Sequence, residues 1–232
     1  MIKLANVLKI SRKCLVPARV LLLPNFDFEQ YMRIRNQNVC IISDTCWGGY
    51  TYHSLDMPFQ SPFINMFLIG SEYKKLICNL QYYLAQPLEF VRHDVEIQNN
   101  LSTTYPVCRL GDVEIHCNHY HSYENAKEIW DKRVKRFDFQ NIFIKMNIEE
   151  ESELEIFSEI PYKKIGFSSI PSKGCSDVID LSGEEMSSYI KRNYQGVWSY
   201  INTQADVYHA ELKHYNIIKL LLGEKDYRRT VL

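Results

Sequence analysis

A strand, a helix and a second strand are encoded one after another by Asn141-Ile-Phe-Ile-Lys-Met-Asn-Ile148, the acidic residues after it, and Lys164-Ile-Gly-Phe-Ser168. The first and last segments are short β-rich runs, and an acidic helical pattern lies between them over about residues 150–160. Strands that alternate with helices in this way are typical of α/β domains. This stretch therefore predicts the fold class.

The segments on either side continue the alternation. Strands are expected at residues 39–44, 63–69, 88–92, 113–117 and 177–181, and helices at about 72–85, 122–137, 183–193 and 205–222. Ser71 and Ser122 are expected to cap two of these helices, because a serine hydroxyl accepts a hydrogen bond from the first helical turn. Residues 46–53 and 98–105 are expected to form loops. The sequence thus predicts a three-layer α/β sandwich with a mixed, mostly parallel sheet and helices on both faces.

The charge is unevenly distributed along the 232 residues. Residues 1–36 carry seven basic and two acidic side chains, a charge of +5, which leaves −6 for the rest of the chain. Apolar residues recur at helical spacing over residues 2–15, which is typical either of a helix on an anionic membrane surface or of a short helix docked on its own domain. We therefore divide the chain into a basic amphipathic N-terminal segment, 1–36, and a single α/β domain, 37–232.

The cysteines and the hydropathy pattern predict a cytoplasmic protein. Seven cysteines are dispersed without a C-x-x-C pair, which is typical of reduced thiols. No run of about 18 apolar residues is present, and Pro17 and Arg19 interrupt the stretch that most resembles a signal peptide. Residues 2–19 leave open a peripheral contact with the inner face of the cell membrane. The net charge of −1 does not indicate nucleic acid as a partner.

A histidine-rich segment marks one half of the expected site. Three of the seven histidines, His116, His119 and His121, fall within six positions where a strand gives way to a helix. In α/β proteins, such junctions are where sites are usually built. One histidine acting as a general base, or contacting a phosphate or sugar, is favoured over a metal site, because H-x-x-H-x-H matches none of the strong zinc signatures. Structural roles are the remaining alternative.

The other half is expected in Asp44-Thr-Cys-Trp-Gly-Gly-Tyr50, directly after a predicted strand. Paired glycines allow the backbone to approach a ligand closely. The Trp and Tyr could stack on a sugar or base, or the segment could be a tight turn whose Trp fills the core. A nucleophilic Cys46 is the weaker hypothesis, because it requires a nearby base and a lowered pKa.

The helix expected at 122–137 carries Arg133 and Arg136 one turn apart, where they could clamp a pyrophosphate. Cations near a helix C-terminus also offset the helix dipole, which is the alternative explanation. The chain has no fingerprint for dinucleotide binding, no P-loop and no nucleophile elbow. The Asp-x-Asp common in metal-dependent glycosyltransferases is also absent.

Several motifs occur together in a specific order: Ile41-Ile-Ser-Asp-Thr-Cys46-Trp47-Gly48-Gly49-Tyr50, Ser61-Pro62-Phe63, Asn79-Leu-Gln-Tyr-Tyr83, Tyr105-Pro106, Asp112-Val-Glu-Ile-His116, His119-Tyr120, and Ala126 with Trp130, Arg133 and Arg136. Over about residues 30–222 the chain resembles the bacterial domain-of-unknown-function family numbered 1919, whose members are often labelled exopolysaccharide biosynthesis proteins. The resemblance implies an α/β fold and a role among capsule or exopolysaccharide genes, without an established reaction. Asp44 and Cys117 depart from the family pattern, so the resemblance supports no role for either position.

These residues predict a cytoplasmic, membrane-apposed enzyme of exopolysaccharide or capsule biosynthesis that transfers a glycosyl or related group from a phosphate-bearing donor. His119, assisted by His116, would be the base that activates an acceptor hydroxyl, and the two arginines would offset charge on the departing phosphate. A nucleotide sugar or lipid-linked saccharide is the expected partner, and the cofactor is left open. The residues expected to bind substrate are Asp44, Cys46, Trp47, Gly48, Gly49, Tyr50, Ser61, Tyr120, Trp130, Arg133 and Arg136; no metal ligand is assigned.

Two alternatives remain at this stage. The first is a metal-dependent hydrolase or esterase built on His116, His119 and His121, which requires the three side chains to converge. The second is a non-catalytic glycan-binding protein of the same pathway, in which the aromatic residues bind glycan and the histidines are structural.

Overall fold

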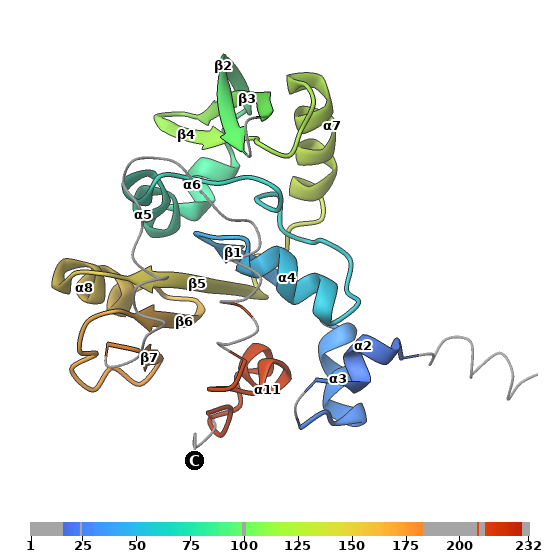
Figure 1. Ribbon diagram of the computed structural model, residues 1–232, viewed down its shortest axis with the longest axis vertical. Helices are drawn as coiled ribbons and strands as arrows, with labels where there is room; N and C mark the ends of the chain where they lie inside the picture. Colours follow the sequence, from blue (N-terminus) through green and yellow to red (C-terminus); the bar gives the residue numbers. More distant parts are fainter. Residues whose placement is uncertain (1–15, 24, 99–100, 183–207, 209–211, 229–232) are drawn as a thin grey trace, which may run out of the picture.

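The computed structural model describes residues 16–23, 25–98, 101–182, 208 and 212–228. Its central element is a parallel sheet of four strands in the order β1-β5-β6-β7 (Figure 1). The strands are β1 (Cys40–Ser43), β5 (Ile142–Ile148), β6 (Lys163–Ser168) and β7 (Val178–Asp180). All seven residues of β5 are buried, as expected for an inner strand with both faces covered. The predicted α/β class with a mostly parallel sheet is confirmed.

Helices pack on both faces of this sheet, because successive strand side chains point to opposite sides. Ile42 and Ile144 belong to one cluster of buried residues, and Ile41 and Phe143 belong to the other. The first cluster includes residues of α5 (Gly70–Cys78), α6 (Leu80–Leu84), α7 (Tyr123–Val134) and α8 (Glu151–Glu159). The second includes residues of α2 (Ala18–Leu21), α3 (Phe28–Arg35), α4 (Trp47–Ser54) and α11 (Ile217–Leu222). The three-layer arrangement follows from these two clusters.

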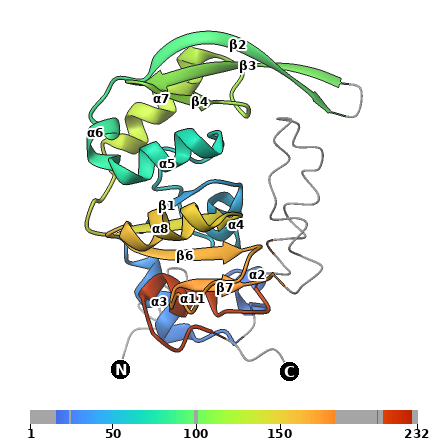
Figure 2. The same cartoon turned by 90° about the vertical axis from the view of Figure 1, so that its left-hand side faces the viewer.

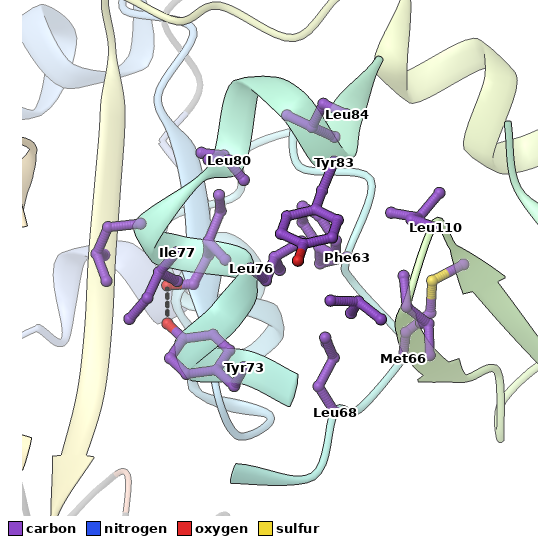
Figure 3. Close-up of a cluster of buried hydrophobic side chains, with 14 of the residues drawn as sticks. Phe63, Met66, Leu68, Tyr73, Leu76, Ile77, Leu80, Tyr83, Leu84 and Leu110 are labelled. Atoms are coloured by element: carbon purple, nitrogen blue, oxygen red, sulfur yellow. Dashed lines mark hydrogen bonds between the residues drawn. The ribbon is translucent and has the colours of Figure 1, made fainter. Parts of the chain in front are cut away.

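A second, antiparallel sheet in the order β2-β3-β4 stands apart from the first (Figure 2). It consists of β2 (Glu89–Gln98), β3 (Leu101–Leu110) and β4 (Val113–His116). Its apolar residues join the first cluster, so α5 and α6 are packed between the two sheets. Figure 3 shows this packing, with Tyr73, Leu76, Ile77, Leu80, Tyr83 and Leu84 from the two helices against Phe63, Met66, Leu68 and Leu110. The antiparallel strands therefore form a sheet of their own.

Most of the predicted strands and helices are present. Residues 39–44, 141–148, 164–168 and 177–181 contain the four strands of the parallel sheet, and residues 88–92 and 113–117 correspond to β2 and β4. The helix predicted from Ser122 is α7, and the Ser122 side chain accepts a hydrogen bond from the Asn125 N–H at 3.2 Å. The acidic helix is α8. These segments have strong local patterns, so neighbouring residues suffice to predict them.

Three predictions about the central region were wrong. The expected loop at 98–105 belongs largely to β3, because its backbone groups pair with β2 in a hairpin. The expected strand at 63–69 contains only an isolated bridge between Phe67 and His116, and Asn65 there has a φ of 68°, which an extended strand does not accommodate. The expected helix at 72–85 is two helices, α5 and α6, which meet at Asn79; α5 begins at Gly70, so Ser71 does not cap it.

The expected loop at 46–53 is also wrong, because these residues form α4. The Ser43 and Thr45 side chains accept hydrogen bonds from the Gly48 and Trp47 N–H groups at 3.0 and 3.4 Å, which satisfies donors of the first helical turn. Trp47 and Tyr52 are buried against the sheet. Tertiary packing therefore outweighs the low helix propensity of the paired glycines.

Residues 2–15 and the helix predicted at 183–193 lie outside the described residues. The described part of 205–222 is helical at Tyr208 and in α11, whose N-terminus is capped by Asn216. In the expected N-terminal segment, Val20, Tyr31 and Ile34 are buried in the same cluster as α4 and α11. Throughout the described part of the chain, no helix is both long enough and apolar enough to cross a membrane.

Candidate functional site

A cavity of about 330 Å³ lies where the carboxyl end of β1 meets the loop of residues 59–67 and the end of the second sheet. Its apolar lining residues are Ile41, Phe59, Phe63, Ile64, Met66 and Phe67. Its polar lining residues are Ser43, Thr45, Cys46, His53, Asn65, Glu96, Asn118 and His119, and Gly49 and Tyr50 also line it. Ligand sites of α/β proteins commonly occupy this end of the parallel strands. The cavity is therefore the candidate site.

The turn from β1 into α4 forms one wall of the cavity. The Ser43 hydroxyl donates to the Thr45 carbonyl at 2.7 Å and accepts from the Gly48 N–H at 3.0 Å. A Cβ at Gly48 would lie 3.0 Å from the Ser43 Oγ and 3.2 Å from the Ile64 Cδ1, so the helix packs closely there because Gly48 has no side chain. Gly49, which lines the cavity, has much more space around it. Of the two glycines, only Gly49 is placed to contact a ligand.

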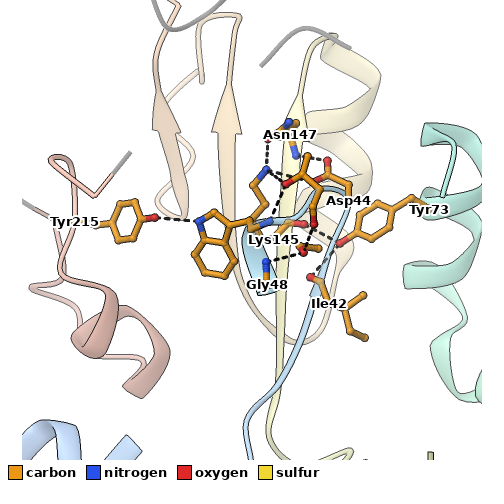
Figure 4. Close-up of polar contacts among 10 residues, drawn as sticks. Ile42, Asp44, Gly48, Tyr73, Lys145, Asn147 and Tyr215 are labelled. Carbon is orange, nitrogen blue, oxygen red and sulfur yellow. Dashed lines mark hydrogen bonds and ion pairs between the residues drawn. The ribbon is translucent and has the colours of Figure 1, made fainter. Parts of the chain in front are cut away.

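A buried polar network lies beside this wall (Figure 4). The Lys145 Nζ lies 3.2 Å from the Asp44 Oδ1 and 3.3 Å from the Thr45 Oγ1, and it also contacts the Asn147 side chain. The Asp44 Oδ2 accepts from the Asn147 backbone N–H at 2.7 Å. Asp44 and Lys145 are only 3% and 1% exposed. The structure therefore corrects the prediction that Asp44 contacts substrate, because the Asp44 carboxylate binds Lys145 and Asn147 instead.

The predicted pyrophosphate clamp is also corrected. Arg133 is buried, and its Nη1 donates to the Ile64 carbonyl at 2.9 Å and to the Tyr120 hydroxyl at 3.1 Å. The Tyr120 hydroxyl itself donates to the Ile64 carbonyl, and Arg136 donates to the Phe59 carbonyl. These three side chains hold the backbone of the loop of residues 59–67, which lines the cavity. None of them is part of the lining, so they position the site rather than bind the ligand.

Trp47, Trp130 and Ser61 have structural roles as well. The Trp47 indole N–H donates to the Tyr215 hydroxyl at 3.0 Å, and its ring stacks on Phe143 with centroids 6.0 Å apart. Trp130 packs edge-to-face on Phe63, and the Ser61 hydroxyl accepts from the Phe63 N–H. All three side chains are buried outside the lining, which corrects their predicted contact with substrate. The alternative in which Trp47 fills the core is the one observed.

The three histidines are separated in the fold. His119 is exposed and lines the cavity, whereas the exposed His121 does not. His116 is buried outside the lining, where it stacks on Phe67 with ring centroids 4.4 Å apart and its Nδ1 lies 3.3 Å from the Tyr105 hydroxyl oxygen. Burial lowers the pKa of His116, although the charge of nearby Asp94 acts in the opposite direction. The predicted catalytic role is thus structurally compatible with His119, while His116 supports the cavity wall.

The metal-hydrolase alternative required convergence of these histidines. In the described ranges, no group of three or more His, Cys, Asp or Glu residues is arranged to hold a metal ion. The histidine cluster of that alternative is therefore not formed by His116, His119 and His121.

Several lining residues were not identified from the sequence. The Asn118 amide donates to the Glu96 Oε2 at 3.4 Å, and both residues line the cavity. Asn118 lies inside the histidine-rich segment, which could have indicated it. Glu96 lies beyond residue 92, where the predicted strand ends, and no motif in the neighbouring sequence indicates a role for it.

Cys46 is exposed and lines the cavity but is poorly suited to be a nucleophile. The surrounding protein raises the pKa of its thiol by desolvation, and the charge of Glu96 raises it further, whereas Lys145 lowers it. A raised pKa disfavours the reactive thiolate, whereas a cysteine nucleophile needs a lowered pKa.

Comparison with known proteins matches residues 18–219 to the family described as Domain of unknown function (DUF1919). An uncharacterized protein of Haemophilus influenzae is 33% identical over 162 residues, which cover 68% of this chain and 75% of that protein. The range matched by the family includes every described residue that lines the cavity. On this match, which spans most of its length, the chain belongs to the DUF1919 family.

Proposed function

We propose that this protein is an enzyme of exopolysaccharide or capsule biosynthesis that binds a saccharide in the cavity and transfers a glycosyl or related group. The observation that carries the proposal is that His119 and the start of α4 line one cavity at the carboxyl end of a parallel strand. In this proposal, His119 accepts the proton of an acceptor hydroxyl as the general base.

The chemistry of the lining supports a saccharide ligand. Tyr50 and Phe59 offer aromatic rings on which the C–H groups of a sugar can pack. Asn65, Asn118 and Glu96 offer amide and carboxylate groups for its hydroxyls. A cavity lined by both apolar and polar side chains is typical of small-molecule sites.

The donor and the location are parts of the same proposal. A nucleotide sugar or a lipid-linked saccharide remains the proposed donor, but Arg133 and Arg136 are occupied by backbone carbonyls and do not offset its phosphate charge. We place the enzyme in the cytoplasm, apposed to the inner face of the membrane through the basic residues 2–19. The charge of this region supports that placement.

The test replaces His119 with Ala and uses His121→Ala as the matched control, since His121 is exposed two residues away but outside the lining. Thermal-shift screening of nucleotide sugars and oligosaccharides first identifies a ligand, and release of the donor's leaving group then measures turnover. We expect His119→Ala to lose about 100- to 10,000-fold in turnover with unchanged folding. His121→Ala should retain activity.

A fully active His119→Ala enzyme would contradict the assigned base. A saccharide that binds without any turnover in the unmodified protein would instead favour the non-catalytic glycan-binding alternative. A stabilising ligand adds about 2.7 kcal/mol at 100 times its dissociation constant, so the screen can detect binding whether or not turnover follows.

A further inference from the structure

The charges around the cavity are strongly unbalanced. Among the described residues of its lining, Glu96 is the single carboxylate, and neither lysine nor arginine occurs. The hydrogen bond that Glu96 accepts there comes from Asn118, an uncharged amide. The cavity therefore carries a carboxylate whose charge its described neighbours in the lining do not neutralise.

Four described cations on elements around the cavity are bound to other groups. Lys145 is paired with Asp44 in the buried network beside the cavity, at 3.2 Å. Arg92, on the same strand as Glu96, is paired with Glu114 at 2.7 Å. Arg133 and Arg136 bind loop carbonyls. Within the described residues, each of these positive charges is already matched to another acceptor.

The charge of Glu96 also acts on Cys46, which lines the same cavity at the start of α4. The pKa of the Cys46 thiol is raised first by desolvation and then by the charge of Glu96, which outranks the opposing effect of Lys145. A phosphate group in the same space would be repelled by the carboxylate, and this repulsion is stronger in a partly desolvated cavity than in water. A carboxylate instead accepts hydrogen bonds from hydroxyl groups and, more strongly, from ammonium groups.

We infer that the cavity is the subsite for an uncharged or amino-bearing sugar and excludes phosphate-bearing groups, with Glu96 as the residue that sets this specificity. This inference rests on the proposed function for the saccharide itself. It deepens that function by assigning the cavity to the acceptor rather than to the phosphate-bearing part of the donor.

The first test measures the charge preference of the cavity without any sugar. Cationic and anionic methanethiosulfonate reagents are applied to the full-length protein above neutral pH, where histidine side chains are generally uncharged. Modification of the Cys46 peptide is followed by mass spectrometry, which separates it from the other cysteines. Both rates are proportional to the fraction of Cys46 present as thiolate, so their ratio does not depend on that fraction.

We expect the cationic reagent to react several-fold faster than the anionic one, and Glu96→Gln to reduce this ratio. Glu89→Gln is the matched control, because Glu89 lies on the same strand, is exposed and pairs with Arg109 at 3.0 Å away from the lining. This control should leave the ratio unchanged. A preference for the anionic reagent, or a ratio that Glu96→Gln does not alter, would overturn the inference.

The second test compares glucose, glucosamine and glucose 6-phosphate by thermal shift. Glucose and glucosamine should stabilise the protein more than the phosphate, and Glu96→Gln should narrow the difference. If glucose 6-phosphate binds as well as glucose to both the unmodified protein and Glu96→Gln, the inference is overturned. Saccharide binding itself would still stand. If none of the sugars binds but the thiol ratio is as expected, the saccharide function fails and the exclusion of anions by Glu96 stands.

Discussion

Lys145, in the middle of β5, and Asp44, directly after β1, form an ion pair with almost no access to solvent. Removing two charges from water is costly, and it is tolerated because the pair is hydrogen-bonded on several sides. Asn147 contributes both its side chain and its backbone N–H to the pair. The pair therefore joins the two strands directly beside the cavity.

We predict that Asp44→Asn destabilises the protein by about 3–5 kcal/mol, because it leaves the ammonium of Lys145 buried without a counter-charge. Urea denaturation measures the loss. The double variant Asp44→Asn with Lys145→Met should recover part of it, since the uncompensated charge is then removed. Glu128→Gln, which breaks the exposed pair with Lys132, should have little effect. A near-neutral Asp44→Asn would show that the pair is not required for folding.

At the scale of elements, α4 carries both a structural and a ligand-facing glycine. A Cβ at Gly48 would crowd Ser43, Ile41 and Ile64 at 3.0–3.2 Å, whereas one at Gly49 would meet only Ile64 at 3.9 Å. The two adjacent positions therefore serve as controls for each other.

We predict that Gly48→Ala is less stable than Gly49→Ala by about 1–3 kcal/mol, because overpacking costs more than alanine gains in a helix. Chemical denaturation of both variants measures the difference. Gly49→Ala should keep its stability but weaken binding of any ligand found for the cavity, since its methyl group projects into the space. The opposite order of stability would mean that the strand and loop around Gly48 adjust freely.

The β2–β3 hairpin shows that pairing between strands can determine the secondary structure of a segment. The sequence predicts a strand only to residue 92 and a loop at 98–105, yet Asp94 pairs with Tyr105 and Glu96 with Thr103 in the antiparallel register. Pairing satisfies the backbone of both segments at once, which neither segment encodes alone. The extension is what brings Glu96 to the cavity.

At the scale of the whole molecule, His116 joins the second sheet to the cavity loop. Its ring stacks on Phe67 and lies beside Tyr105, while Asp94, Arg92 and Glu114 are the charged groups that act on it. Desolvation is the largest influence and lowers the pKa of His116 in the folded protein. The unfolded chain therefore binds a proton at this residue more readily than the folded protein does.

We predict that stability falls as the pH drops below about 6.5, the ordinary pKa of histidine, and continues to fall until the lowered folded-state pKa is reached. His116→Phe should show a smaller loss between about pH 7 and pH 5.5, because it removes this proton uptake and retains the ring. His121→Gln, a change at an exposed position, should follow the unmodified protein. Denaturation at each pH measures the free energy of unfolding. If this free energy changes with pH in the same way for His116→Phe and for the unmodified protein, His116 is not the source of the pH dependence.

The sequence by itself determined the α/β class, the parallel strands, the cap of α7 and the placement of His119 at a strand–helix junction. These features depend on residues a few positions apart, whose periodicity and hydrogen bonding are local. The tertiary structure alone decided which side chains reach the cavity. Asp44 and Lys145 are 101 residues apart, and Trp47 and Tyr215 are 168 apart. Packing and desolvation across the whole fold determine such contacts. For this reason Arg133 and Trp47 have structural roles, whereas Glu96 lines the cavity.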